Sequence, residues 1–169
     1  MSRLALVLIA ALLPVLPAGA AEVPVLRRVL PTGMTVLVRE DPGVGVVAAS
    51  LQVRAGSMFE TEATAGITNF MQRVMLRGTE RRSARALAEA AEELGGSLDA
   101  SGEVETAELR VAAIARQWEP LLALLAEVAL EPTFPAAEIE RERGLLLGQL
   151  QTRADNPFPR TFDTALRDV

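Results

Sequence analysis

The hydrophobic positions of this chain follow a period of two residues in some segments and of about 3.6 residues in others, which predict strands and helices respectively. The period of two predicts a hairpin of residues 25–30 and 34–39 around the turn Pro31-Thr32-Gly33. It also predicts a strand at residues 46–53 and a strand pair at 97–101 and 107–114. The strand at 46–53 is apolar almost throughout, so we expect it to lie in the centre of its sheet.

Helical periodicity occurs between and after these strands. It predicts helices within residues 66–79 and at residues 84–94, 117–130, 136–153 and 159–169. Ser83 is expected to cap the second of these helices, and Gly78 to end the first one in a left-handed conformation. The order of strands and helices predicts an α+β domain, in which helices pack on one face of a largely antiparallel sheet.

The helix predicted within residues 66–79 has two distinct faces. Its apolar residues recur at helical spacing and form one stripe: Ile67, Phe70, Met71, Val74 and Met75. Asn69, Gln72 and Arg73 lie on another face, because residues three and four apart are neighbours on a helix. One interpretation of these three polar residues is the solvent-exposed face of an amphipathic helix.

Structural roles are expected for several other side chains. We expect Met71, Met75 and Trp118 to belong to the hydrophobic core. The charged run Glu138–Arg143 is expected to be the solvated start of its helix, where the helix dipole favours acidic residues.

The composition excludes several kinds of chemistry. The chain has 169 residues, which fit one domain or a large part of one. It has no cysteine and no histidine, which removes disulfides, thiolate ligands, the commonest metal ligand and the commonest general base. Its formal net charge is -5 and it has no basic patch, so we expect no nucleic-acid partner.

The N-terminal residues 1–20 are typical of a signal peptide. Arg3 is followed by an apolar run from Leu4 to Leu16 and by the small residues Ala18-Gly19-Ala20, after which we expect cleavage. A membrane anchor is the alternative, but Pro14 lies within the run and Pro17 directly follows it, and the run is shorter than the roughly 20 apolar residues of a membrane span. We therefore expect a mature chain of residues 21–169, periplasmic or secreted, without a stable membrane anchor.

Four stretches of the chain resemble the N-terminal domain of pitrilysin/insulinase-type peptidases, a family with an inverted zinc motif that includes the mitochondrial processing peptidase. The stretches are Leu30–Val36, Arg54–Ser57, Gly66–Thr79 and Glu140–Arg143. The third resembles the zinc helix of the family, which reads G-hydrophobic-A-H-F-L-E-H before a short run into G-T. The resemblance implies a processing-peptidase-like metallohydrolase fold. It also implies that the domain is truncated at its C-terminus, because family domains are larger.

The zinc motif of this family, H-x-x-E-H, has changed at every functional position. In the motif, two histidines one helical turn apart bind zinc, and the glutamate takes a proton from the metal-bound water. The resemblance places the histidines at Asn69 and Arg73, the general base at Gln72, and a distal glutamate ligand at Gln149. None of these side chains suits zinc or proton transfer. We therefore expect no catalytic residue, no bound zinc and no other cofactor.

Glu142 is an acidic residue that the chain retains where the family has an auxiliary acid. We expect it to form an ion pair with Arg73 across the vacated pocket.

These expectations favour a catalytically inactive peptidase homologue. In this interpretation the chain pairs as a heterodimer with an active homologous subunit in the periplasm and contributes structure or substrate contacts. Two alternatives are a truncated gene product and a stand-alone protein that binds extended peptides. A third is an active metalloendopeptidase with an unusual metal arrangement, which chelator-sensitive cleavage of a peptide would reveal.

Overall fold

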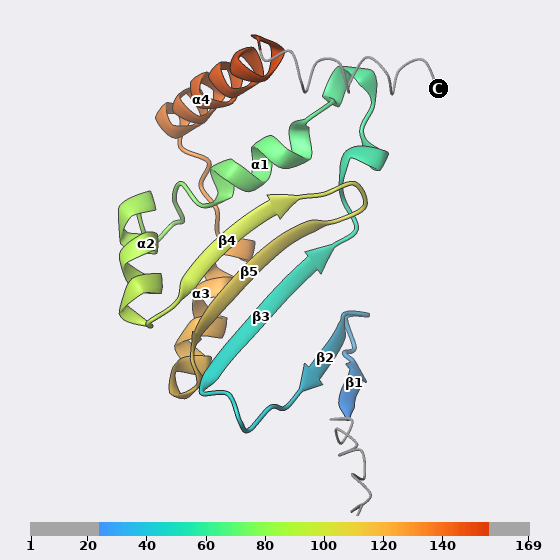
Figure 1. Cartoon of the computed structure of the whole chain (residues 1–169), viewed down its shortest axis with the longest axis vertical. Coiled ribbons are helices and arrows are strands. Elements are labelled where there is room, and N and C mark those ends of the chain that lie inside the picture. Colours follow the sequence, from blue (N-terminus) through green and yellow to red (C-terminus); the bar gives the residue numbers. More distant parts are fainter. Residues whose placement is uncertain (1–23, 156–169) are drawn as a thin grey trace, which may run out of the picture. The chain divides into compact units, whose positions relative to one another are not determined.

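The computed structural model describes residues 24–155, which divide into one compact unit up to Val44 and a second from Gly45 on (Figure 1). The first unit is a β-hairpin, as the alternating pattern predicts. Its strands β1 (Val25–Val29) and β2 (Thr35–Arg39) are antiparallel. Gly33 in the turn between them has φ 86°, a backbone conformation that residues with a side chain rarely adopt.

Three antiparallel strands form the sheet of the second unit. They are β3 (Val46–Val53), β4 (Ser97–Gly102) and β5 (Ala107–Ile114), in the order β3-β5-β4. The register of β3 on β5 places Val46 opposite Ile114. The prediction that residues 46–53 form the central strand is wrong for this sheet, where β5 lies in the centre. A continuous apolar run indicates burial on both faces of a strand and does not determine how many neighbours the strand has.

Four helices accompany this sheet. They are α1 (Ile67–Met75), α2 (Ala84–Glu93), α3 (Trp118–Leu130) and α4 (Ala136–Asp155). Short 3₁₀ turns precede α1 at Ser57–Phe59 and Glu62–Thr64, and a third precedes α3 at Ala115–Gln117. The predicted cap is confirmed, since the Ser83 side chain accepts a hydrogen bond from the Ala86 amide. The helix expected at residues 159–169, like the signal peptide, lies outside the described residues.

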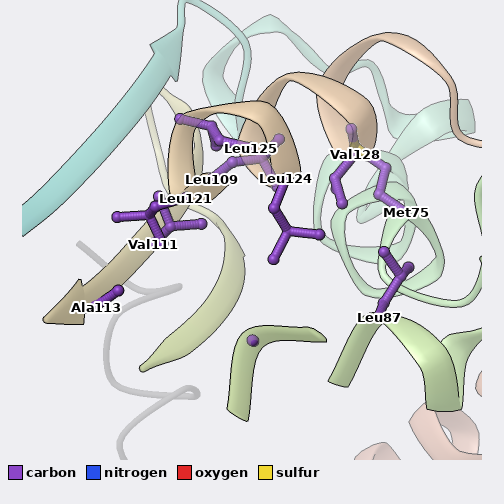
Figure 2. Close-up of a cluster of buried hydrophobic side chains, with 10 residues drawn as sticks. Met75, Leu87, Leu109, Val111, Ala113, Leu121, Leu124, Leu125 and Val128 are labelled. Atoms are coloured by element: carbon purple, nitrogen blue, oxygen red, sulfur yellow. The ribbon is translucent and has the colours of Figure 1, made fainter. Parts of the chain in front are cut away.

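The hydrophobic core lies between α1, α2, α3 and one face of the sheet (Figure 2). Alternate residues of β5 supply the sheet side of the core, as the period of two requires. The buried members are Met75, Leu87, Ala91, Leu109, Val111, Ala113, Leu121, Leu124, Leu125 and Val128. Because the helices contribute to one cluster on one face, the predicted α+β arrangement is confirmed. No helix within residues 24–155 is long and apolar enough to cross a membrane.

The opposite face of the sheet carries a polar cluster. The Ser50 hydroxyl donates a hydrogen bond of 2.6 Å to Glu108, and the Arg110 guanidinium donates to both oxygens of the same carboxylate. These partners lower the pKa of Glu108, with the Ser50 hydrogen bond as the largest cause.

Trp118 is 50% exposed, so the prediction that it belongs to the core is wrong. It is the first residue of α3, and burial of that helix begins one turn later, at Leu121.

Candidate functional site

Helix α1 begins at a left-handed glycine and an acidic cap. Gly66 has φ 89°, and the Glu60 carboxylate accepts hydrogen bonds from the Gly66 amide at 2.6 Å and the Thr68 amide at 2.8 Å. These bonds satisfy N–H groups that the start of a helix leaves without a partner. They also lower the pKa of Glu60, with the Thr68 backbone bond as the largest cause. Sequence reasoning missed this role, because Glu60 lies outside the usual capping spacing.

Helix α1 ends earlier than predicted. Its last residue is Met75, and Gly78 instead forms an isolated β-bridge with Ser83. That bridge holds Gly78 with φ 158°, so the prediction that this glycine ends the helix in a left-handed conformation is wrong.

The apolar stripe predicted for α1 is buried only at its C-terminal end, by Val74 and Met75. At the other end, Ile67 and Met71 are 53% and 37% exposed. Met75 therefore belongs to the core as predicted, whereas the prediction for Met71 is wrong.

Thr68 and Gln72 are buried instead, because the α1 backbone packs closely against β4. A Cβ atom added to Gly102, the last residue of β4, would lie 3.0 Å from the backbone nitrogen of Asn69. Such a close approach brings the polar side of the helix against the sheet. The spacing of apolar residues contains no signal for it.

The three polar residues of α1 have different surroundings. Asn69 is exposed, Gln72 is 4% exposed, and the Arg73 side chain is 30% exposed. The interpretation of these residues as a solvent-exposed face is therefore right for Asn69 alone. The Gln72 Oε1 atom is buried and has no hydrogen-bond partner within residues 24–155, which is unfavourable for an amide.

Arg73 forms the expected ion pair with Glu142 of α4. Its Nε lies 3.4 Å from Glu142 Oε2, and a terminal nitrogen of Arg77 lies 2.7 Å from Glu142 Oε1. Glu142 is 1% exposed, so the prediction of a solvated start of α4 is wrong for this residue. Sequence reasoning missed Arg77, although its position one turn after Arg73 was the available signal.

Gln149 lies on the same side of α4 as Glu142, seven residues later. Two helical turns correspond to a rise of about 10 Å. Its side chain is exposed and makes no hydrogen bond within residues 24–155. The structure therefore brings Arg73 and Glu142 together, whereas no hydrogen bond within residues 24–155 joins Gln149 to either residue.

The segment after α1 is fixed to α3 by a buried carboxylate. Glu127 of α3 accepts a hydrogen bond of 2.6 Å from the Thr79 hydroxyl and forms an ion pair with Arg82. Glu127 is 6% exposed, so both contacts compensate the burial of its charge. This attachment positions the C-terminal end of α1 and therefore Arg77.

The groups at this site are amides, guanidinium groups and one carboxylate. Within the part of the chain that the structure describes, no group of three or more His, Cys, Asp or Glu side chains could hold a metal ion. Amide and guanidinium groups cannot act as a general base near neutral pH. They can donate hydrogen bonds and, in the case of arginine, attract an anion.

Comparisons with known proteins relate the chain to peptidases. The family model described as Insulinase (Peptidase family M16) matches residues 35–168. The chain is 31% identical over 124 residues to mitochondrial-processing peptidase subunit beta of Homo sapiens, covering 73% of this chain and 25% of that protein. It is 28% identical over 140 residues to an uncharacterized zinc protease of Rickettsia bellii, covering 83% of this chain and 34% of that protein. The chain thus spans about a quarter to a third of the length of these relatives.

Solved structures with the same fold include three bacterial proteins. A peptidase M16 inactive domain from Pseudomonas fluorescens matches with a TM-score of 0.73 and 25% identity, over 79% of this chain and 32% of that one. A protease from Helicobacter pylori matches with a TM-score of 0.75 and 18% identity, over 82% and 34%. The periplasmic protease PqqL from Escherichia coli matches with a TM-score of 0.73 and 20% identity, over 82% and 16%. The predicted processing-peptidase-like fold is therefore confirmed.

Proposed function

The chain belongs to the insulinase family, peptidase family M16, and we propose that it is a non-catalytic member that serves as a structural or substrate-binding subunit. One observation carries the proposal. Arg73, at the position that the family resemblance assigns to a zinc-binding histidine, forms an ion pair with the buried carboxylate of Glu142. The positively charged Arg73 side chain, held in place at this position, repels a zinc ion that would occupy the same site.

Zinc does not fit the donor set of this chain. Zinc in proteins is bound by thiolate, imidazole and carboxylate groups, whereas the four corresponding positions hold Asn69, Gln72, Arg73 and Gln149. The Glu142 carboxylate, which contacts Arg73, is occupied by two guanidinium groups. Gln72 at the position of the base cannot take a proton from water. No hydrolytic step follows from these residues.

The proposed role needs the fold and its surfaces but no metal. Among the similar proteins, the name of the mitochondrial-processing peptidase relative describes it as subunit beta of that peptidase. The Pseudomonas fluorescens structure is described as an inactive domain of a peptidase of the same family. By analogy, the partner of this chain would be an active homologue, and together they would form a heterodimer. The leader-like residues 1–20 and the similarity to a periplasmic protease support the periplasm as the compartment.

A pull-down from the periplasm tests this role. The mature chain, tagged at its C-terminus, should retain an M16 peptidase that has an intact zinc motif. The purified chain alone should neither bind stoichiometric zinc nor cleave an unstructured peptide. Chelator-sensitive cleavage by the chain alone would contradict the proposal.

A further inference from the structure

We propose that the surface of α1 that carries Asn69 and Arg73 binds a carboxylate group of a peptide. The inference rests on the proposed substrate-binding role and specifies the chemistry of the substrate. A side-chain carboxylate and a C-terminal carboxylate share this chemistry.

Positive charge exceeds negative charge at this surface. Arg73 and Arg77 each form an ion pair with Glu142, and neither has a second acidic partner within residues 24–155. Two guanidinium groups that share one carboxylate leave one positive charge uncompensated, because arginine stays protonated in proteins. An anion from outside the described chain would restore the balance.

Arg73 also has hydrogen-bond donors available for such an anion. Its Nε donates to Glu142 at 3.4 Å, whereas its two terminal nitrogens make no hydrogen bond within the described residues. The side chain is 30% exposed, so a ligand can reach these nitrogens. The planar guanidinium group presents its donors as a fork that matches the two oxygens of a carboxylate.

Asn69 adds a second donor on the same side of the helix. It lies four residues before Arg73, which makes the two side chains neighbours, and it is exposed. The Asn69 backbone lies against Gly102, at the end of β4, and β4 has one edge without a partner in the described sheet. An acidic residue of an extended peptide at that end of the strand would reach both donors.

The experiment uses the full mature chain and four dansyl-labelled peptides of one unstructured sequence. The central residue is glutamate or glutamine, and the C-terminus is free or amidated. We expect the peptides that carry a carboxylate to bind at least about tenfold more tightly than the neutral, amidated peptide. The carboxylate position that gives the larger gain in affinity, the central side chain or the C-terminus, identifies which of the two groups is the ligand.

Three variants assign the preference to named residues. Arg73→Gln should abolish it, and Asn69→Asp should abolish it by placing a negative charge beside the ligand. Arg85→Gln should leave it unchanged, because this arginine is 88% exposed on α2 and has its own acidic partner, Glu89. Circular dichroism melts show whether each variant folds. If Arg73→Gln unfolds, Asn69→Asp still tests the inference, because Asn69 is exposed and its replacement is not expected to disturb the fold.

Equal affinity for the four peptides overturns the inference, as does the absence of binding. A preference that survives both Arg73→Gln and Asn69→Asp in folded protein overturns it as well. Those outcomes leave the non-catalytic role intact. In contrast, stoichiometric zinc together with peptide cleavage would overturn the non-catalytic role, so the two failures can be distinguished.

Discussion

Arg73 and Glu142 lie 69 residues apart in the chain and form an ion pair between α1 and α4, with Nε and Oε2 3.4 Å apart. Arg77 contacts the second oxygen of the same carboxylate at 2.7 Å. The carboxylate side chain is 2% exposed, whereas the two arginines are 30% and 38% exposed. An ion pair therefore joins α1 and α4 at the position that the family resemblance assigns to a zinc ligand.

Replacement of the shared carboxylate should destabilise the fold. We expect Glu142→Gln to lower the free energy of unfolding by about 1–3 kcal/mol, since it leaves two guanidinium groups without their charged partner. The partial exposure of both arginines keeps the effect below that of a fully buried pair. Urea denaturation monitored by circular dichroism measures the change.

Double-mutant cycles measure the Arg73–Glu142 and Arg77–Glu142 interactions separately. The coupling energy of Arg77 with Glu142 should exceed that of Arg73 with Glu142, because its contact is shorter. The exposed pair Arg85–Glu89 on α2 is the control, with a coupling of at most about 0.5 kcal/mol. Coupling near zero in both Glu142 cycles would show that the cluster does not hold α4 to α1.

The sequence predicts most elements of this fold but not the faces that they bury. The periods of two and 3.6 residues locate the strands and helices, since each element keeps its own geometry. The central position of β5 and the exposure of Trp118 depend on partners far along the chain, which local periodicity does not encode.

At the candidate site, family resemblance predicts the positions while tertiary packing determines the surroundings. The ion pair between Arg73 and Glu142 was predicted because two motif positions carry opposite charges. The burial of Gln72 was not predicted, because it depends on how closely the backbone of α1 approaches Gly102. An amide on a helix is normally expected to face water, and a backbone contact of this kind leaves no trace in the apolar pattern.

Gly102→Ala tests this close contact directly. The new methyl group would lie 3.0 Å from the Asn69 nitrogen and 3.2 Å from the Thr68 carbonyl carbon. We expect a loss of about 1–3 kcal/mol in the free energy of unfolding, typical of overpacking. Gly148→Ala is the matched control: nothing lies within 4 Å of its added Cβ on α4, so a gain of up to about 1 kcal/mol from helix propensity is expected. An equal effect of the two variants would contradict the contact.

The Glu60 cap should make the stability of α1 depend on pH. Hydrogen bonds from the Thr68 and Gly66 amides lower the pKa of Glu60 from its ordinary value of 4.5. Because the folded state favours the charged form, this stabilisation is present above the unfolded pKa and is lost as the pH falls through the lowered, folded value.

Thermal melts of wild type and Glu60→Gln across the acidic range measure this effect. The melting temperature of the variant should lie below that of wild type near neutral pH, and the gap should narrow as the pH falls below 4.5. Glu93→Gln, an exposed residue at the end of α2, provides the control. A gap that stays constant with pH would show that the charge of Glu60 does not contribute.

Restoration of the family's ligands should create a zinc site. We expect Asn69→His/Arg73→His/Gln149→Glu to bind one equivalent of zinc, because histidines four residues apart on a helix can share one metal and a carboxylate from α4 adds a third ligand. Wild type, which offers amides and a guanidinium at these positions, should retain none after dialysis. Elemental analysis and competition with a chromophoric chelator measure the zinc bound by the triple variant and by wild type.

The control for this variant is Arg85→His/Glu89→His, which places two histidines one turn apart on α2 without a third ligand. Zinc should bind the triple variant at least about tenfold more tightly than this control, because each additional ligand bond contributes to the affinity. Equal affinities would show that Gln149 does not lie within reach of the metal position. A wild-type chain that copurifies with one chelator-removable zinc would instead contradict the non-catalytic assignment, because it would require a ligand set that the positions of Asn69, Arg73 and Gln149 do not provide.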